Sequence, residues 1–346
     1  MASLSLAGIS KRFDAVSALN NMELDIENGE FFVLLGPSGA GKTTTLRVIA
    51  GLEQPDAGTV YMNGEDVTSW HVAERDCAFV FQQYSLYPHL SVYENIAFPL
   101  RSPLRALKDE EIKRRVGKVA EILHIDSKLG RRATELSGGE MQRVALGRAL
   151  VREPRVFLMD EPLSSLDAKL REELRVEIKR IQQDLNATVV YVTHDQVEAT
   201  TMADRIGILE AGQLRQVGTP QDVYENPRSA YVAQRLGSPA MNFLPVAWFA
   251  GHPPRGASQV AVRPEDIRLV LSMAEAGKIA SAGSLSLKVI ECSLLKHELI
   301  AERDGVQVNV SSVLEHQYAS GDLVHLEIPV QRCLYFSESG QRVQPH

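Results

Sequence analysis

A short segment near the N-terminus places glycine, lysine and threonine at a spacing that can bind a polyphosphate. Residues 36–43 read GPSGAGKT and match the pattern G-x-x-x-x-G-K-[ST]. Glycines let backbone N–H groups approach phosphate oxygens, and a following helix adds its dipole. We expect Lys42 to reach the β- and γ-phosphates and Thr43 to bind Mg²⁺ through its hydroxyl. The predicted cradle consists of Gly36, Pro37, Ser38, Gly39, Ala40, Gly41, Lys42, Thr43 and Thr44.

Two acidic residues follow an apolar run farther along the chain. Residues 156–159 are Val-Phe-Leu-Met, and Asp160 and Glu161 come directly after them. Alone, such a run is more often a strand that meets a solvated turn. In a parallel α/β sheet, however, the carboxyl ends of the strands meet at one edge, beside the phosphate loop. We therefore expect Asp160 to hold Mg²⁺ and Glu161 to orient or deprotonate the attacking water.

A third apolar run, residues 187–193, ends at His194. A single histidine after a strand is usually an ordinary turn residue. Here a third strand end would deliver an imidazole to the same edge of the same sheet. Because an imidazole can hydrogen-bond a γ-phosphate oxygen, we predict a catalytic role for His194.

The segment Leu-Ser-Gly-Gly-Glu at residues 136–140 begins a helical pattern that runs to Leu150. Ser137 and Glu140 have the spacing of a capping box, so the segment could simply be a well-capped helix start. Alternatively, Ser137, Gly138 and Gly139 present a hydroxyl and N–H groups to a γ-phosphate. One chain cannot easily place both phosphate-binding segments on one nucleotide, whereas two chains arranged head to tail can.

Length and composition are those of a globular enzyme. The 346 residues indicate about two domains, and the 44% apolar and 23% charged content is ordinary. A net charge of −7 argues against nucleic acid as the main partner. No apolar run approaches the ~20 residues of a membrane span, and the N-terminus lacks the apolar core of a signal peptide. The scattered cysteines Cys77, Cys292 and Cys333 suggest free thiols in a reducing cytosol.

The pattern of apolar residues changes near residue 235. Residues 1–235 predict a nucleotide-binding α/β domain, with a charged helical subdomain over about residues 83–152. Residues 236–346 predict a small OB-like β-barrel, because short alternating strands are separated by turns. An OB-like barrel can bind nucleic acid, but this one is neither basic nor rich in aromatic residues. The alternating residues are Leu285, Leu287 and Val289; Val306, Val308 and Val310; and Val324, Leu326, Ile328 and Val330.

The motifs resemble, in order, those of the ATP-binding cassette (ABC) ATPases: GPSGAGKT, Gln82, LSGGE, VFLMDE, SSLD at residues 164–167, and His194. The resemblance implies a P-loop core with an inserted helical subdomain. It implies that Gln82 contacts Mg²⁺ and senses the nucleotide, that Asp167 lies in a loop crossing a dimer interface, and that Phe13 stacks on adenine. An early phenylalanine is otherwise more often a core residue. Glu140 departs from the family, which usually has glutamine there; a carboxylate should repel the partner's γ-phosphate modestly.

Residues 80–96, VFQQYSLYPHLSVYENI, resemble the corresponding stretch of maltose-importer type ATPases and of importers for sugars, polyols and glycerol phosphate. In that family the stretch after the glutamine receives a coupling helix from a membrane subunit. Residues 237–243 and 262–267 resemble the TOBE-type regulatory barrels of sugar-importer ATPases. The resemblance implies an ATP- and Mg²⁺-dependent motor subunit at the cytoplasmic face of the bacterial inner membrane. Its implied partners are a second copy or a sister ATPase, two transmembrane permeases and, indirectly, an extracytoplasmic binding protein.

Other functions stay open at this point. The chain could energise import of another solute, such as iron, sulfate or a polyamine. A soluble cassette ATPase acting on DNA or ribosomes would be expected to show a coiled-coil insertion, two cassettes or a basic face, and the sequence shows none of these. A protein that binds ATP without turnover is disfavoured because Glu161 and His194 are both present. The transported substrate cannot be read, because this subunit would never touch it.

Overall fold

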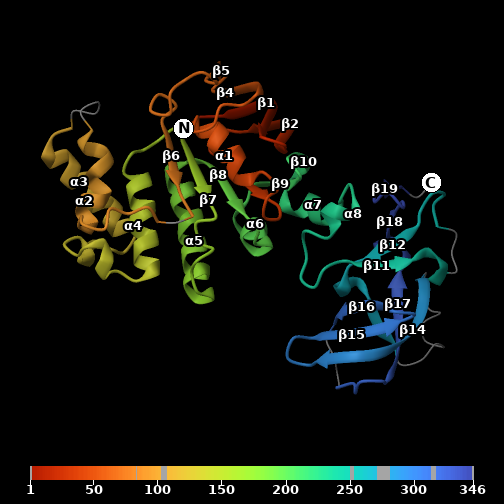
Figure 1. Cartoon of the computed structure of the whole chain (residues 1–346). Helices are drawn as coiled ribbons and strands as arrows, with labels where there is room; N and C mark the ends of the chain where they lie inside the picture. Colours follow the sequence, from red (N-terminus) through yellow and green to blue (C-terminus); the bar gives the residue numbers. More distant parts are fainter. Residues whose placement is uncertain are drawn as a thin grey trace. The chain divides into compact units, whose positions relative to one another are not determined.

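The computed structural model describes residues 2–82, 84–102, 107–249, 253–270, 281–312 and 317–344, with only the backbone of 281–284. The chain divides into two compact units, residues 1–220 and 221–346, which are described separately (Figure 1). The division lies before helix α8 (Ala230–Ala233), which the sequence-based boundary at residue 235 places in the first domain.

The first unit is built on a six-stranded sheet whose order is β10-β9-β3-β8-β7-β6. The five strands from β9 to β6 run parallel, and β10 pairs antiparallel with β9. All five residues of β3 and all six of β8 are buried, as expected for a parallel strand covered on both faces. The strands are β3 (Phe31–Leu35), β6 (Cys77–Val80), β7 (Val156–Asp160), β8 (Thr188–Thr193), β9 (Arg205–Glu210) and β10 (Gln213–Gly218).

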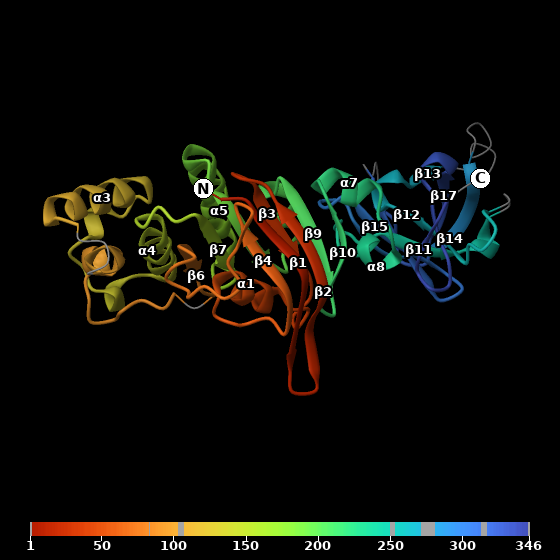
Figure 2. The same ribbon diagram turned by 90° about the horizontal axis from the view of Figure 1, so that it is seen from above.

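A second, antiparallel sheet has the order β2-β1-β4-β5. Its strands are β1 (Leu4–Phe13), β2 (Val16–Ile26), β4 (Ala57–Met62) and β5 (Glu65–Asp66). Apolar side chains of this sheet share one core with helix α1 (Lys42–Ala50) and the central sheet. The β1–β2 hairpin reaches well beyond the other elements of the unit (Figure 2).

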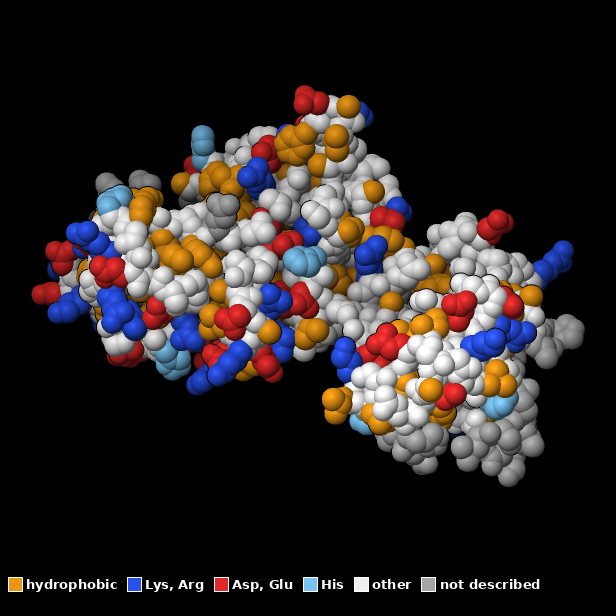
Figure 3. All heavy atoms as spheres, turned by 60° about the horizontal axis from the view of Figure 1, so that its bottom comes forward, with side chains coloured by type: hydrophobic (Ala, Val, Ile, Leu, Met, Phe, Trp, Pro, Cys, Tyr) orange, Lys and Arg blue, Asp and Glu red, His pale blue; other side chains and the backbone are white. Residues whose placement is uncertain are grey.

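Helices surround the central sheet and also form an insertion between β6 and β7. The insertion contains α2 (Val92–Ala97), α3 (Asp109–Ile122) and α4 (Gly138–Leu150), with 3₁₀ turns at Phe98–Arg101, Asp126–Lys128 and Ala133–Glu135. The predicted helical pattern that runs to Leu150 is thereby confirmed. Charges of both signs are interspersed over this region (Figure 3), and on α3 Glu111 pairs with Arg114 and Arg115. After β7 come α5 (Ala168–Leu185) and α6 (Gln196–Met202).

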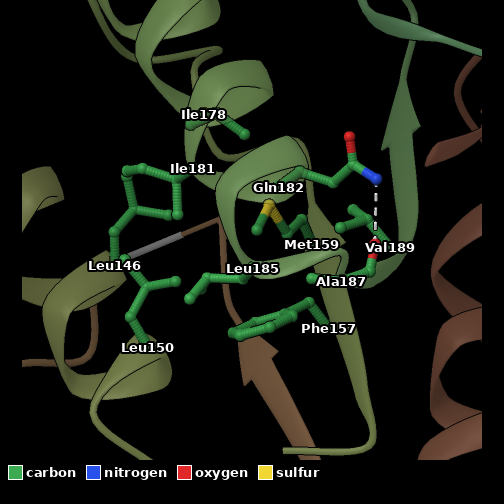
Figure 4. Close-up of a pocket in the computed structure, with 10 residues that line it drawn as sticks. All are labelled: Leu146, Leu150, Phe157, Met159, Ile178, Ile181, Gln182, Leu185, Ala187 and Val189. Carbon is green, nitrogen blue, oxygen red and sulfur yellow. Dashed lines mark hydrogen bonds between the residues drawn. The ribbon is translucent and has the colours of Figure 1, made fainter. Parts of the chain in front are cut away.

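A small cavity of about 20 Å³ lies between α4, α5 and strands β7 and β8 (Figure 4). Its lining is apolar except for Gln182, whose Nε2 donates to Ala187 O over 3.0 Å. A buried water needs two to four polar partners, so this space is a packing gap and not a polar ligand site. The lining residues are Leu146, Leu150, Phe157, Met159, Ile178, Ile181, Gln182, Leu185, Ala187 and Val189.

The second unit contains helix α8 and two antiparallel sheets, with orders β11-β12-β18-β19 and β13-β17-β14-β15-β16. Helix α7 (Pro220–Glu225) spans the division between the units. The strands are β11 (Asn242–Pro245), β12 (Gln259–Val262), β13 (Arg268–Val270), β14 (Ser281–Ser293), β15 (Glu298–Arg303), β16 (Val306–Ser311), β17 (Leu323–Pro329), β18 (Leu334–Phe336) and β19 (Arg342–Val343). The 3₁₀ turns are Val246–Trp248, Pro264–Asp266 and Val330–Arg332.

The alternation read from the sequence of the second unit matches its core. Leu285, Leu287 and Val289 on β14 are buried, as are Val308 and Val310 on β16. Val330 is the exception: the strand ends at Pro329, and Val330 is 41% exposed in a 3₁₀ turn. The prediction of Val330 as a strand residue is therefore wrong, because the proline residue ends the ladder one position earlier.

The segment 262–267 has a structural role in the second unit. Arg263 is buried, and its guanidinium donates to Ala233 O, Leu236 O and Tyr224 O while stacking on the Tyr224 ring at 3.8 Å. Tyr224 in turn hydrogen-bonds Glu265. Arg263 and Glu265 of the segment 262–267 thus fasten helices α7 and α8 to the strands.

Candidate active site

The phosphate loop joins the end of β3 to the start of α1. Gly39 and Gly41 have positive φ angles of 78° and 106°. A Cβ at Gly41 would lie 2.4 Å from Ala18 O, and one at Gly36 would lie 2.6 Å from Leu209 O, so neither position has room for a side chain. Gly41 is the N-cap of α1 and offers no side-chain hydrogen bond. The first N–H groups of the helix are therefore available to an anion.

Lys42 is held inside this loop. Its side chain is 5% exposed, and Nζ donates to Gly36 O over 3.0 Å and to Pro37 O over 3.1 Å. The same Nζ lies 3.4 Å from Glu161 Oε1. The lysine therefore links the phosphate loop to the acidic end of β7.

Thr43 and Asp160 form the second link between these elements. Thr43 Oγ1 donates to Asp160 Oδ1 over 3.0 Å. Asp160 is 7% exposed, and its burial raises the pKa of the carboxyl, an effect that the Thr43 hydrogen bond opposes. A hydroxyl and a carboxylate side by side are oxygen ligands of the kind that Mg²⁺ prefers.

Glu161 lies between two nitrogen groups. Oε1 faces Lys42, and Oε2 lies 3.1 Å from His194 Nδ1. The residue has a positive φ of 44°, and its N–H donates to Val192 O on β8. Ser164 Oγ donates to Glu161 O over 2.9 Å. A non-glycine residue in this backbone region is uncommon, and these bonds hold it there.

The turn after β8 is held by buried polar contacts. Asp195 caps α6 by accepting the N–H groups of Val197 and Glu198, and it lies 3.5 Å from Arg171 on α5. Glu198 is buried and accepts hydrogen bonds from Tyr191 and Thr193. These contacts fix the β8–α6 turn, so that His194, 60% exposed, stands directly before a capped helix.

Five predicted residues are thus brought together: Lys42, Thr43, Asp160, Glu161 and His194. Gln82 follows β6, whose last residue Val80 is paired with Met159 of the neighbouring β7. The glutamine is exposed at the same sheet edge, close in register to Asp160.

The capping box before α4 is formed. Glu140 Oε2 accepts from the Ser137 N–H and hydroxyl, and Oε1 lies 3.1 Å from Lys128 Nζ. The backbone hydrogen bond from Ser137 is the largest cause of a lowered pKa at Glu140. A Cβ on Gly139 would lie 2.0 Å from Leu170, so the glycine lets α4 approach α5 closely. Among the described residues, Ser137 and Glu140 make no hydrogen bond to the phosphate loop of their own chain.

Two further predicted residues lie apart from this cluster. Asp167 is the N-cap of α5 and accepts the Leu170 N–H over 3.1 Å. Phe13 is 41% exposed on the β1–β2 hairpin, with Lys11 Nζ 5.2 Å from its ring. Phe13 is therefore not a core residue, and its stacking on adenine stays a prediction.

The aromatic loop after Gln82 is more buried than the sequence indicates. Tyr84, Leu86 and Tyr87 are half-buried, and the Tyr87 ring packs on Phe98 at 4.5 Å. Arg148 of α4 lies 5.8 Å from that ring and donates to Ser85 O over 2.6 Å. Sequence reasoning missed Arg148, because an arginine within a helical pattern carries no sign of the loop it will hold.

A family model described as ABC transporter matches residues 19–164. The chain is 42% identical to the sn-glycerol-3-phosphate import ATP-binding protein of Chromohalobacter salexigens, over 99% of this chain and 96% of the relative. It is 54% identical to the trehalose/maltose import ATP-binding protein of Thermococcus litoralis, over 70% of this chain and 67% of the relative.

The chain belongs to the ABC importer ATP-binding subunits. This ABC ATPase binds ATP and hydrolyses it to power transport, and it has the predicted α/β core, helical insertion and OB-like C-terminal domain. Its core resembles a solved dimeric bacterial ABC transporter cassette at 32% identity, with a TM-score of 0.57 and coverage of 63% of this chain and 98% of the cassette. A second dimeric structure of that kind, a post-hydrolysis state bound to ADP and phosphate, gives the same values. None of the helices within the described ranges is long and apolar enough to cross a membrane.

Proposed function

We propose that this ABC ATPase is the motor subunit of a bacterial importer for a sugar, a polyol or glycerol phosphate. The observation that carries the proposal is the meeting of Lys42, Asp160, Glu161 and His194 at one sheet edge, in a chain similar along its length to a glycerol-phosphate import protein. Trehalose/maltose and osmoprotectant uptake proteins are also similar. An importer for iron, sulfate or a polyamine is the alternative, and a soluble non-transport ABC ATPase is less favoured.

The contacts support a proposed role for each residue of the cluster. Phosphate oxygens of ATP would replace the Gly36 and Pro37 carbonyls as acceptors for Lys42. Glu161 would then be free to accept a proton from the attacking water, and His194 would hold its second oxygen and reach the γ-phosphate. Gln82 would sense the nucleotide from the end of β6. The machinery therefore supplies positioning and charge neutralisation, which is what phosphoryl transfer to water requires.

The donor set at Thr43 and Asp160 fits Mg²⁺. Among the described residues, no group of three or more His, Cys, Asp and Glu side chains could hold a metal by itself. Mg²⁺ usually combines one or two protein oxygens with phosphates and water, which matches one hydroxyl and one buried carboxylate. Thr43, Asp160 and Gln82 would hold the ion, which would neutralise charge on the phosphates.

A head-to-tail dimer would complete each site. The Ser137, Gly138 and Gly139 segment begins α4 with its hydroxyl and N–H groups at a helix N-terminus, and would face the γ-phosphate bound by the partner's loop. Asp167 begins α5 in the loop that would cross the interface. Dimeric cassettes among similar structures support this arrangement. We propose a homodimer, with a heterodimer containing a sister ATPase as the alternative.

The remaining partners are two transmembrane permeases and, through them, an extracytoplasmic binding protein. The loop 84–90 begins two residues after Gln82, and Phe81 and Phe98 near it are 39% and 49% exposed. Exposed aromatic residues suit a docking helix. The chain would then be a peripheral protein at the cytoplasmic face of the inner membrane, with no nucleic-acid partner.

The test is reconstitution with the permeases and binding protein encoded beside this chain. ATPase activity and uptake of sn-glycerol 3-phosphate, maltose and trehalose are measured in the same vesicles. We expect one of these solutes to stimulate ATPase activity, and Leu86→Ser to reduce stimulation and uptake while basal activity stays within about twofold. Stimulation only by iron, sulfate or a polyamine would favour the alternative importers. ATPase activity that does not change when the permeases are present would contradict the proposal.

A further inference from the structure

We propose that Tyr84 is a positioning residue that ties together three loops of the hydrolysis machinery within one protomer. Its hydroxyl Oη lies 3.0 Å from Ser165 Oγ in the SSLD loop at residues 164–167. The two residues are 81 positions apart in the sequence. Tyr84 itself stands two residues after Gln82. On the proposed function, on which this inference rests, the bond joins the nucleotide-sensing loop to the loop that would cross the dimer interface.

The same hydroxyl also lies near Gly138, at the start of the signature helix. A Cβ added to Gly138 would lie 3.2 Å from Tyr84 Oη, which is tighter than most contacts of real Cβ atoms. The absence of a side chain at Gly138 therefore gives the tyrosine its place against α4. The tyrosine hydroxyl lies where the sensing loop, the SSLD loop and the signature helix meet.

The backbone at Tyr84 is also held by hydrogen bonds. Arg148 Nη2 donates to Tyr84 O over 3.3 Å, and Nη1 donates to Ser85 O over 2.6 Å. Ser85 has a positive φ of 50°, so the chain bends here in a conformation that L-residues seldom adopt. Because Arg148 belongs to α4, these two bonds tie the loop after Gln82 to the signature helix.

From Ser165 the connection continues through the neighbouring Ser164 to the backbone carbonyl of Glu161. The adjacent Ser164 donates from Oγ to Glu161 O over 2.9 Å, and from its N–H over 3.3 Å. A shift of the sensing loop therefore reaches Glu161 through Tyr84, Ser165 and Ser164, without passing through the nucleotide. We infer that Tyr84 acts by aligning Glu161 and the SSLD loop with the signature segment, and not by contact with ATP.

The experiment compares Tyr84→Phe, Ser165→Ala and the double variant in the full-length protein. Each single change removes one hydroxyl of the pair and leaves the rest of the side chain. One neutral hydrogen bond corresponds to about a fivefold effect. We expect either single variant to lower kcat about fivefold with KM for ATP unchanged, and the double variant to be no worse than the singles. Ser165→Thr, which keeps a hydroxyl, should recover most of the parent kcat.

Tyr61→Phe on β4 is the matched control for losing a tyrosine hydroxyl elsewhere in the same unit. Thermal unfolding of every variant separates positioning from stability. Losses that multiply in the double variant would show that the two hydroxyls act independently and would overturn the proposal. Unchanged kcat in both singles, or a fall in kcat matched by an equal fall in the folded fraction, would overturn it as well. The result does not depend on which solute is imported, because basal ATPase activity is the readout.

Discussion

Glu161 Oε2 lies 3.1 Å from His194 Nδ1, although the two residues follow different strands, β7 and β8. The other oxygen of the same carboxylate faces Lys42 at 3.4 Å. Glu161 is 16% exposed and His194 60% exposed, so the pair spans from the sheet edge to the surface where a γ-phosphate would arrive. Each oxygen of the carboxylate therefore faces a nitrogen group. The first two predictions test the proposal that Glu161 and His194 act together in hydrolysis.

Glu161→Gln keeps the shape of the side chain and removes its charge and its ability to accept a proton. We expect ATP binding to persist and hydrolysis to fall at least about 100-fold, within the range for loss of a general base. Phosphate release and nucleotide binding measure the two effects, and size-exclusion chromatography with ATP should show a trapped dimer. Turnover within about threefold of the parent would show that another group acts as base.

His194→Ala removes the partner of Glu161 Oε2 and the reach toward the γ-phosphate. Hydrolysis should again be lost while ATP affinity is kept. His71→Ala is a suitable control, because His71 is exposed in a turn before β6. The role of His194 would be wrong if its variant and the control hydrolysed ATP equally fast.

Lys42→Ala should weaken nucleotide binding itself. The ammonium is a buried donor aimed into the loop, and a hydrogen bond to a charged group contributes about 1.5–3 kcal/mol, or about tenfold or more in affinity. Lys42→Arg should also bind poorly, because the planar guanidinium does not fit a site built for a point charge. Equilibrium binding of a fluorescent ATP analogue measures both. Affinity within about twofold (~0.4 kcal/mol) of the parent for Lys42→Ala would contradict the cradle assignment.

Glu140→Gln restores the residue that the family usually carries. Glutamine can still accept from Ser137, so the helix cap should survive, while repulsion of the partner's γ-phosphate is removed. We expect turnover to rise about two- to fivefold, which corresponds to ~0.4–1 kcal/mol. The variant loses the exposed pair with Lys128, whose contribution to stability is about 0–1 kcal/mol. Lys128→Gln breaks the same pair without removing the carboxylate, so an equal rise in that control would assign the effect to the ion pair.

Glu198→Gln tests a buried carboxyl outside the reacting groups. Burial raises the pKa of Glu198 despite hydrogen bonds from Thr193 and Tyr191. An acid whose pKa is raised in the folded state destabilises the fold when it is ionised. This loss of stability is absent below the unfolded-state pKa of about 4.3 and complete above the folded-state pKa. The amide should therefore stabilise the protein more at pH 8 than at pH 5, as measured by urea unfolding. A difference that is the same at both pH values would contradict this reasoning.

The sequence predicts most of the site because its signals are local. The glycine pattern and the helix expected after it appear as the loop that follows β3 and as α1. The acids after β7 and the histidine after β8 meet because parallel strands share one carboxyl edge. Tertiary contacts between distant side chains leave no such signal. Tyr84 and Ser165, or Lys128 and Glu140, are ordinary surface residues until the fold places them together.

The residues that sequence reasoning missed or misread are likewise those held by tertiary contacts. Tyr87 reads as a docking aromatic, and only the structure shows Phe98 and Arg148 packed against it. Arg75 is another case, because it is fully buried and donates to Val48 O and Ile49 O at the end of α1. A single arginine in the sequence does not indicate that role.

The position of β3 in the central sheet also affects how this protein is made. Its hydrogen-bonded neighbours are β8 and β9, where Phe31 pairs with Val189 and Phe32 with Arg205. On a translating ribosome, five apolar residues that end up fully buried therefore wait without either neighbour until the chain has grown past residue 188. Such a delay leaves an aggregation-prone strand for chaperones to protect. A nascent chain that stops before β8 would carry the complete GPSGAGKT loop and still have no nucleotide site.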